Sequence, residues 1–258
     1  MPSAITLRNV AVHASNQPLL TSVSFSVPTS AITVVAGPNG AGKSTLLGVL
    51  TGERSPRTGT VELFGQPLRA YARAELAKLR AVMPQDIRLD VPMRVREVVA
   101  LGRFPHRKTS TQQADNAHIT RALEHTATAH LASRLYHSLS GGERARVAVA
   151  RLLVQEAPVM ILDEPIASLD PKHQYLVLEL LQRTAAEGAA VIVVLHDLHL
   201  AREYAQHAVL LKQGAVAAAG SARDVLTPRR LAAVFDTAFA SGTLANGKNV
   251  IVPVAPVR

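Results

Sequence analysis

A glycine-rich loop that ends in a lysine and two hydroxyl side chains has the most specific chemistry in this sequence. It follows a short β-branched run over 32–36 and precedes an apolar helical pattern over 44–50. Between a strand and a helix, backbone N–H groups converge on one anion, and glycines let the chain approach it closely. The pattern predicts a polyphosphate site made of Gly37, Pro38, Asn39, Gly40, Ala41, Gly42, Lys43, Ser44 and Thr45.

The last three residues of this loop have distinct expected tasks. Lys43 can reach the β- and γ-phosphates of a nucleotide, Ser44 can ligate Mg²⁺, and Thr45 can bond the α-phosphate. We therefore predict ATP and Mg²⁺ as the ligands. The alternative is an ordinary glycine turn before a helix, which the flanking strand and helix patterns make the weaker interpretation.

Two carboxylates follow a second apolar run, over 159–162. A phosphate loop needs a carboxylate at the end of a neighbouring strand to hold the Mg²⁺ shell, and Asp163 is placed for that task. Glu164 comes one residue later and can accept a proton from the attacking water. Taken alone, such a pair is more often a solvated strand end, so its meaning depends on the loop.

A second anion cradle is indicated by Ser140, Gly141 and Gly142, which precede a helical pattern. A serine followed by two glycines at a helix N-terminus exposes backbone N–H groups. A serine cap with two flexible glycines would explain this motif alone, but not its occurrence beside the other two. One chain thus carries two half-sites.

The elements that must position these residues follow from hydrophobic periodicity. Segment 5–27 reads as antiparallel strands, 59–65 as another short strand, and 91–153 as helices. The continuous apolar runs 159–162 and 191–195 are typical of strands buried on both faces of a parallel sheet, with a crossover helix expected over 174–187. We predict an α/β fold with an inserted helical subdomain.

Composition supports this fold and restricts the function. Hydrophobic residues make up 48% of the 258 residues and aromatic residues only 3%, so the core must consist mainly of aliphatic side chains. The chain has no cysteine, which excludes disulfides and thiolate chemistry and permits a reducing compartment. From the sequence we expect neither a secretory signal nor a membrane-spanning run. The net charge of +9 favours anionic partners, but the absence of interleaved aromatic residues argues against nucleic acid.

Taken together, these motifs resemble those of ABC ATPases over nearly the whole chain. The resemblance implies a RecA-like P-loop NTPase core with a mainly parallel sheet, an N-terminal antiparallel β subdomain and an inserted helical subdomain. It also implies roles for Gln85 at Mg²⁺ and the attacking water, for Asp170 at a dimer interface, and for His196 at the γ-phosphate. We expect residues 1–88 and 156–225 to form the nucleotide-binding core, 89–155 the helical subdomain, and 226–258 a C-terminal extension.

The resemblance further implies an assembly. In the family, two cassettes form a head-to-tail dimer in which each ATP lies between the phosphate loop of one subunit and the serine–glycine motif of the other. One copy of each motif means that this chain must pair with another subunit, most simply itself. Polytopic permease subunits and a substrate-binding protein are the other expected partners, and the chain would lie peripherally on the cytoplasmic face of the membrane.

The adenine contact departs from the family pattern. Family members often stack adenine on an aromatic residue before the phosphate loop, whereas this chain offers only His13 in that region. An imidazole stacks less extensively than a tyrosine ring. We therefore expect His13 at the base.

Three features resemble the subgroup that imports iron chelates, haem and cobalamin. These are the stretch 101–106, the stretch 172–174, and the compact length. The first points most toward haem, with ferric siderophore or cobalamin as alternatives. Because this subunit does not normally touch the cargo, the inference is by association.

Several other interpretations are open or weaker. A soluble, non-transport ABC ATPase is less expected because such relatives fuse two cassettes or insert a long coiled coil. A small-molecule kinase would leave Ser140 and Asp170 unexplained. Five histidines between 106 and 137 suggest a haem or metal site, but their spacing fits a polar helical surface better.

Overall fold

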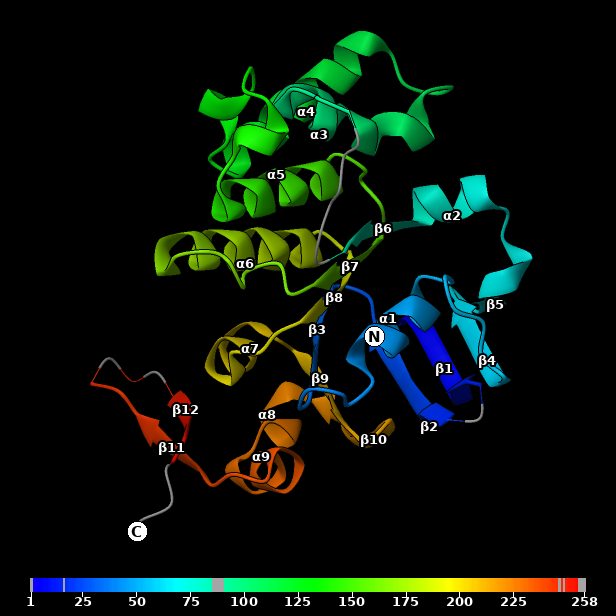
Figure 1. Ribbon diagram of the computed structural model, residues 1–258, viewed down its shortest axis with the longest axis vertical. Coiled ribbons are helices and arrows are strands. Elements are labelled where there is room, and N and C mark those ends of the chain that lie inside the picture. The colour runs from blue at the N-terminus through cyan, green and yellow to red at the C-terminus, as the bar shows by residue number, and fades with distance from the viewer. Residues whose placement is uncertain (1, 16, 85–90, 246, 248, 255–258) are drawn as a thin grey trace.

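The computed structural model of the protein describes residues 2–15, 17–84, 91–245, 247 and 249–254. Its central layer is a sheet in the strand order β10-β9-β3-β8-β7-β6 (Figure 1). Neighbours from β9 to β6 run parallel, and β10 is antiparallel to β9. The strands span Arg80–Met83 (β6), Val159–Asp163 (β7), Ala190–Val194 (β8), Ala31–Ala36 (β3), His207–Lys212 (β9) and Ala215–Ser221 (β10).

Successive side chains of this sheet enter different cores. On β3, Ile32 and Val34 belong to one buried cluster and Val35 to another. Neighbouring strands repeat the alternation, as Leu162 and Ile161 show on β7. Both faces are therefore covered, which explains why these strands are apolar throughout rather than alternating.

One face of the central sheet packs against α1 (Lys43–Leu50) and an antiparallel sheet. That second sheet has the order β2-β1-β4-β5, with bounds Gln17–Pro28, Ser3–Ala14, Thr58–Leu63 and Gln66–Pro67. The predicted antiparallel strands over 5–27 are confirmed. The strand predicted over 59–65 ends earlier, because Phe64 and Gly65 turn with positive φ values.

The other face is covered by α6 (Pro171–Ala186) and α7 (Leu198–Tyr204). The predicted crossover helix begins three residues earlier than expected. Asp170 accepts a hydrogen bond from the backbone N–H of His173, and Pro171 occupies the first turn, where its missing N–H costs nothing.

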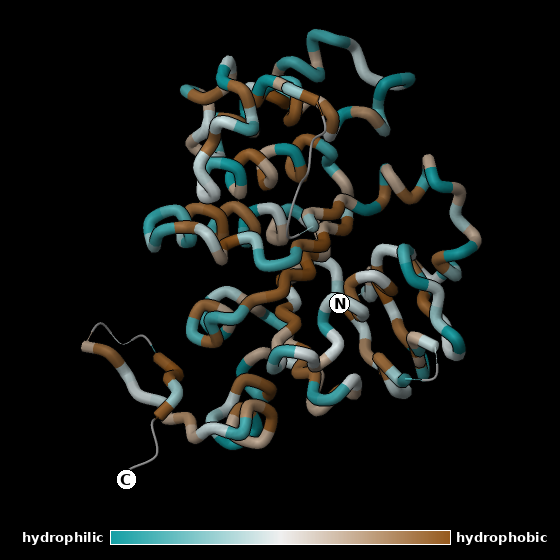
Figure 2. The backbone as a smooth tube through the Cα atoms, viewed as in Figure 1, coloured by the Kyte–Doolittle hydropathy of each residue, from teal (hydrophilic) through white to brown (hydrophobic). Residues whose placement is uncertain are grey.

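The helical subdomain lies between β6 and β7 in the chain and at the top of Figure 1. It contains α3 (Val95–Ala100), η2 (Leu101–His106), α4 (Gln112–His125), η3 (Ala129–Leu131), η4 (Tyr136–Ser138) and α5 (Gly141–Leu153). Helix α5 joins this subdomain to the core, since Val147 packs within it and Val149 packs in the main cluster. The brown stripe along α5 in Figure 2 belongs to these apolar contacts.

The remaining elements lie at the edges. The connection before β6 contains η1 (Leu68–Ala70) and α2 (Arg73–Leu79), and the C-terminal part contains α8 (Ala222–Val225), α9 (Pro228–Phe235), β11 (Phe239–Thr243) and β12 (Asn249–Pro253). Leu231 and Ile251 are buried in the main cluster, so the segment after 225 packs on the core. Among the described residues, none of the helices combines the length and apolar character needed to cross a membrane.

Candidate nucleotide site

The phosphate loop connects the end of β3 to α1, and its glycines are enforced by their neighbours. A Cβ atom on Gly42 would lie 2.9 Å from Leu20 Cδ2 and 3.0 Å from the carbonyl oxygen of Leu19, and its φ is 101°. A Cβ on Gly37 would lie 2.3 Å from the carbonyl oxygen of Leu211. The loop is thus pressed against β2 and β9, which leaves its opposite side available to a ligand.

Lys43 folds back into this loop. Its Nζ donates to the carbonyl oxygens of Gly37 at 2.8 Å and Pro38 at 3.0 Å. Burial lowers the pKa of the Lys43 ammonium group, while the nearby charges of Glu164 and Asp163 oppose that shift. A cation is therefore held inside a backbone cradle, which is the arrangement that a polyphosphate requires.

Ser44 and Thr45 occupy the first turn of α1, directly after Lys43. The Ser44 side chain is exposed and Thr45 is half-buried, so both hydroxyls stand at the helix end that the loop leads into. Asp163 ends β7, a strand near α1. Hydroxyl and carboxylate oxygens are ligands that Mg²⁺ prefers, so this donor set fits the ion.

Asp163 and Glu164 extend past the carboxyl edge of the sheet. Burial and the neighbouring Glu164 carboxylate raise the pKa of Asp163, and Lys43 and His196 counteract part of that rise. Glu164 has a positive φ of 50°, a left-handed conformation that redirects the chain after β7. The two carboxylates therefore leave the strand in a geometry that a regular strand would not provide.

His196 meets Glu164 at this edge. Asp163 pairs with Val194 in the parallel register of β7 and β8, so the residues after both strands emerge side by side. His196 Nε2 lies 2.5 Å from Glu164 Oε1. A carboxylate and an imidazole in contact form a unit that can accept and hold a proton.

The serine–glycine motif begins α5 with a capping box. Ser140 Oγ accepts from the backbone N–H of Glu143 at 3.3 Å, and Glu143 Oε2 accepts from the Ser140 N–H at 2.8 Å. That backbone bond is the main reason why the pKa of Glu143 is lowered. Figure 1 shows α5 and α1 well separated, so one chain does not bring the serine–glycine motif and the phosphate loop together.

Asp170 lies next to this helix end. A Cβ on Gly142 would lie 3.2 Å from the carbonyl oxygen of Ser168, so the loop before Asp170 packs beside the start of α5. Asp170 Oδ2 lies 2.8 Å from His173 Nδ1, and Oδ1 accepts from the His173 backbone N–H, which lowers the pKa of Asp170. Its carboxylate is thus fixed in one orientation.

His13 lies near the end of the β1–β2 hairpin, opposite Pro18. The next part of β2, Leu19 and Leu20, contacts Gly42, so the hairpin end borders the phosphate loop. The Nδ1 atom of His13 is buried without a hydrogen-bond partner among the described residues. Its role at the base stays a prediction, and Gln85 lies outside the described residues.

Two supporting residues were not predicted. Gly214 donates its N–H to the carbonyl oxygen of Ala41 and accepts from the N–H of Thr21, so it ties the loop to β2. His173 fixes the orientation of Asp170. From the sequence, the stretch 172–174 indicated only a resemblance to one subgroup of importers. A glycine in a turn and a histidine three residues after an aspartate are weak signals by themselves.

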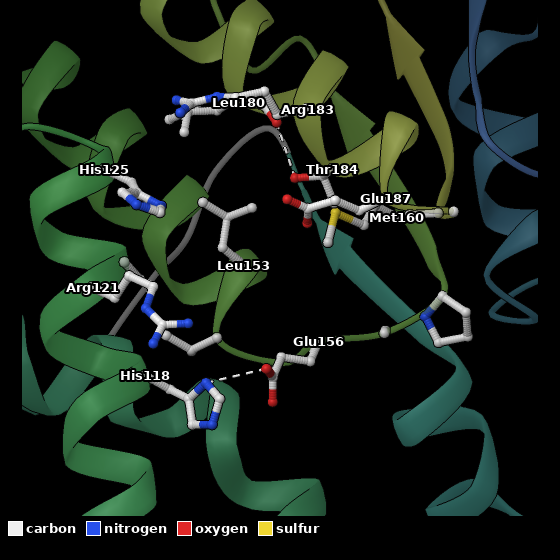
Figure 3. A pocket seen from close by; sticks show the side chains of 16 residues that line it. His118, Arg121, His125, Leu153, Glu156, Met160, Leu180, Arg183, Thr184 and Glu187 are labelled. Carbon is white, nitrogen blue, oxygen red and sulfur yellow. Dashed lines mark hydrogen bonds and ion pairs between the residues drawn. The ribbon is translucent and has the colours of Figure 1, made fainter.

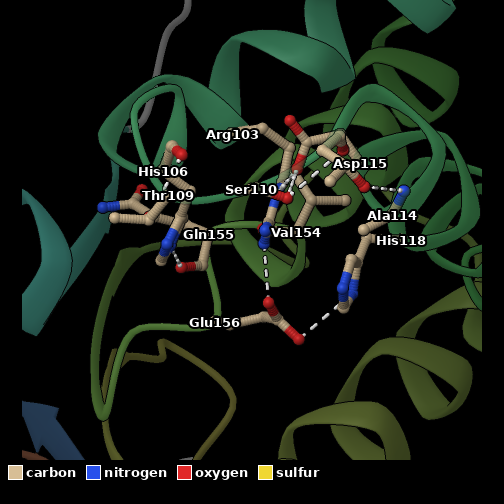
Figure 4. Close-up of polar contacts among 11 residues, drawn as sticks. Arg103, His106, Thr109, Ser110, Ala114, Asp115, His118, Val154, Gln155 and Glu156 are labelled. Atoms are coloured by element: carbon tan, nitrogen blue, oxygen red, sulfur yellow. Dashed lines mark hydrogen bonds and ion pairs between the residues drawn. The ribbon is translucent and has the colours of Figure 1, made fainter.

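The stretch 101–106 is a structural clamp (Figure 4). A Cβ on Gly102 would lie 2.2 Å from the carbonyl oxygen of Arg151. Arg103 is buried and donates to Val154 O, Glu156 and Asp115, each at 2.6 to 2.7 Å. These contacts fix η2 and α4 to the connection between α5 and β7. The residues of the stretch 101–106 therefore have a structural role that is unrelated to the transported cargo.

The chain is similar to known proteins in both sequence and fold. The sequence model of the ABC transporter family matches residues 20–167. The hemin import ATP-binding protein HmuV of Streptomyces coelicolor is 44% identical over 225 residues, covering 87% of this chain and 80% of its own. The cobalamin import ATP-binding protein BtuD of Halobacterium salinarum is 41% identical and covers 94% of this chain and 62% of its own.

Solved structures agree with this result. An inward-facing ABC transporter matches with a TM-score of 0.84 and 27% identity, covering 98% of both chains. The dimeric cassette MJ0796, bound to ADP and Pi, matches with a TM-score of 0.77 and 26% identity over 85% of this chain and 99% of its own. The fold and the nucleotide motifs define a P-loop ATPase. The chain belongs to the ABC transporter family, as an ATP-binding subunit with ATPase activity.

Proposed function

We propose that this chain hydrolyses MgATP to energise haem import, with Glu164 as the general base. The contact between Glu164 and His196 at the sheet edge that also presents Asp163 carries this proposal. Glu164 accepts the proton of the attacking water. His196 orients the Glu164 carboxylate through their hydrogen bond and stabilises its negative charge. Lys43 stabilises the negative charge that develops on the transferred phosphoryl group.

We infer that Ser44, Asp163 and Gln85 hold Mg²⁺, and that Thr45 contacts the α-phosphate. When bound, Mg²⁺ neutralises phosphate charge and orients the β- and γ-phosphates. The raised pKa of Asp163 supports this role, since burial beside another carboxylate leaves a charge that a divalent cation would stabilise. His13 is assigned to the adenine on the position of the β1–β2 hairpin end beside the loop.

We also propose a head-to-tail homodimer. The separation of α5 from α1 supports this arrangement, because the serine–glycine motif cannot reach the phosphate loop of its own chain. In the dimer, Ser140, Gly141 and Gly142 of one copy would face the phosphate loop of the other, and Asp170 would lie at the boundary. The dimeric cassette MJ0796 is a similar structure.

Haem is the proposed cargo because the matched relatives include hemin import proteins that are 41–48% identical. A cobalamin import relative at 41% identity supports cobalamin as the second candidate.

Polytopic permease subunits and a substrate-binding protein would complete the complex, with this chain peripheral on the cytoplasmic face. We propose that the chain divides into three parts: a nucleotide-binding core of residues 1–88 and 156–225, a helical subdomain of residues 89–155, and a C-terminal extension of residues 226–258.

Transport by the reconstituted complex tests the cargo. Proteoliposomes containing this subunit and the permease encoded beside it are supplied with ATP and with haem, a ferric siderophore or cobalamin. We expect ATP-dependent uptake of haem above the other two, with uptake abolished by Glu164→Gln. Uptake of cobalamin in preference to haem would reassign the cargo, and uptake that is independent of ATP would exclude the energising role.

A further inference from the structure

A cleft of about 550 Å³ separates the helical subdomain from the core, away from the nucleotide site (Figure 3). Helix α4 forms one wall and the C-terminal half of α6 the other. Pro158 and Ala189 line it immediately before β7 and β8, whereas Asp163 ends β7 and His196 follows β8 at the opposite edge of the sheet. The cleft is large enough for a small organic ligand and does not overlap the phosphate loop.

Cationic side chains border the cleft on both walls, and they outnumber its two carboxylates, Glu156 and Glu187. Figure 3 shows Arg121 and His125 on α4 and Arg183 on the facing helix α6. All three are exposed, and none of them has a side-chain hydrogen bond or ion pair with any residue that the structure describes. Two unpaired guanidinium groups on facing walls favour an anion between them, because each can bind one carboxylate bidentately.

The floor of the cleft is apolar. Leu153, which is half-buried, and Pro158, which is exposed, present apolar surface to it, whereas Met160 and Leu180 are almost completely buried. Such a floor favours a ligand with an apolar body over a small inorganic ion, since burying apolar surface adds to the binding free energy. An apolar floor with two arginines matches an amphipathic dicarboxylate.

An ion-pair network centred on the buried Arg103 holds the third side of the cleft in place (Figure 4). Glu156 Oε2 accepts from Arg103 at 2.6 Å, and Glu156 Oε1 lies 3.1 Å from His118 Nδ1. Arg103 also pairs with Asp115 on α4. A carboxylate on one imidazole nitrogen fixes the ring and leaves its other nitrogen for a ligand, as in many metal sites.

We propose that this cleft binds an amphipathic dicarboxylate, with one carboxylate on Arg121, the other on Arg183 and the apolar body on the floor. Haem has this chemistry, because its macrocycle is apolar, it carries two carboxylates, and histidine is a common ligand of its iron. The choice of haem rests on the proposed function. A ligand that touches both α4 and α6 restricts movement between the subdomains, so imported haem would slow ATP hydrolysis.

Binding to the purified full-length chain tests the cleft. Haem is titrated and its absorbance recorded, with the dimethyl ester of haem as the ligand that lacks both charges. We expect saturable binding of haem, and Kd at least about tenfold higher for the ester and for the Arg121→Ala/Arg183→Ala variant. The matched control is Arg57→Ala/Arg69→Ala, which removes two exposed arginines on the antiparallel-sheet side and should bind as wild type. Equal affinity in both double variants, or no saturable binding, would overturn the proposal.

The regulatory consequence has a separate readout. Haem should lower ATP hydrolysis by the wild type and the control variant, but not by Arg121→Ala/Arg183→Ala. Inhibition that persists in this variant would refute the cleft as the regulatory site. ATP-driven haem uptake in proteoliposomes distinguishes the two proposals, because failure of the cleft alone leaves uptake by the wild type intact, whereas failure of the proposed function removes it.

Discussion

His196 Nε2 lies 2.5 Å from Glu164 Oε1, and the two residues follow adjacent parallel strands. Each side chain is local to its own strand end, yet the contact joins positions 32 residues apart. The sheet register is therefore what brings a carboxylate and an imidazole together beside the phosphate loop.

Glu164→Gln should abolish most hydrolysis while nucleotide binding is retained. The amide keeps the shape of the side chain but cannot accept the proton, so we expect a loss of about 10²- to 10⁴-fold in kcat. ATPase assays and binding of a fluorescent ATP analogue measure the two effects. Glu124→Gln, on the exposed side of α4, is the control. Turnover near wild type would show that another group is the base.

Lys43→Ala should weaken nucleotide binding and hydrolysis together, because it removes the cation that the loop encloses. We expect a loss of about 2 kcal/mol or more of binding free energy, in the range of hydrogen bonds to charged groups. Isothermal titration with ATP and Mg²⁺ measures it, and the exposed Lys78→Ala serves as the control. Unchanged affinity would remove Lys43 from the site.

Asp163→Asn should stabilise the nucleotide-free protein while reducing hydrolysis strongly. The pKa of Asp163 is raised in the folded state, so the folded protein holds this proton more tightly than the unfolded chain. Ionised Asp163 therefore lowers the stability of the folded protein. This loss of stability develops as pH rises from the ordinary pKa of an aspartate to the raised pKa of Asp163 in the folded state, and it persists at neutral pH. Urea unfolding at pH 7.5 and at acid pH should show a gain for the variant that shrinks on acidification. A loss of stability at pH 7.5 would contradict the burial argument.

Gly102→Ala should destabilise the helical subdomain without touching the nucleotide site. The added Cβ would lie 2.2 Å from Arg151 O, and overpacking of this kind costs about 1–3 kcal/mol. Thermal unfolding measures this cost. Gly242→Ala is the control, since the nearest atom to its Cβ would be 3.9 Å away. Equal melting temperatures for the two variants would argue against the clamp.

His173→Ala should lower ATP hydrolysis by about two- to tenfold with little change in the binding of a nucleotide to one subunit. His173 fixes the Asp170 carboxylate, and one such hydrogen bond contributes about 0.5–1.5 kcal/mol. Steady-state ATPase kinetics with the adjacent, exposed Lys172→Ala as control measure the effect. If both variants matched the wild type, the orientation of Asp170 would be irrelevant to turnover.

The sequence by itself determined the local features of this protein. The phosphate loop, the carboxylates after an apolar run and the Ser140 cap are contiguous, and the apolar periods around them predicted the strands and helices that the structure shows. Contiguous motifs can be predicted because backbone conformation depends on near neighbours.

Only the tertiary structure decided the relations between distant segments. The contact of Glu164 with His196 depends on the register of β7 and β8, the close fit of Gly42 depends on Leu20 of β2, and the raised pKa of Asp163 depends on burial. The cleft between α4 and α6 has no sequence signal, because its arginines lie in separate helices. Periodicity specifies which face of an element is buried, whereas packing between elements determines which side chains meet.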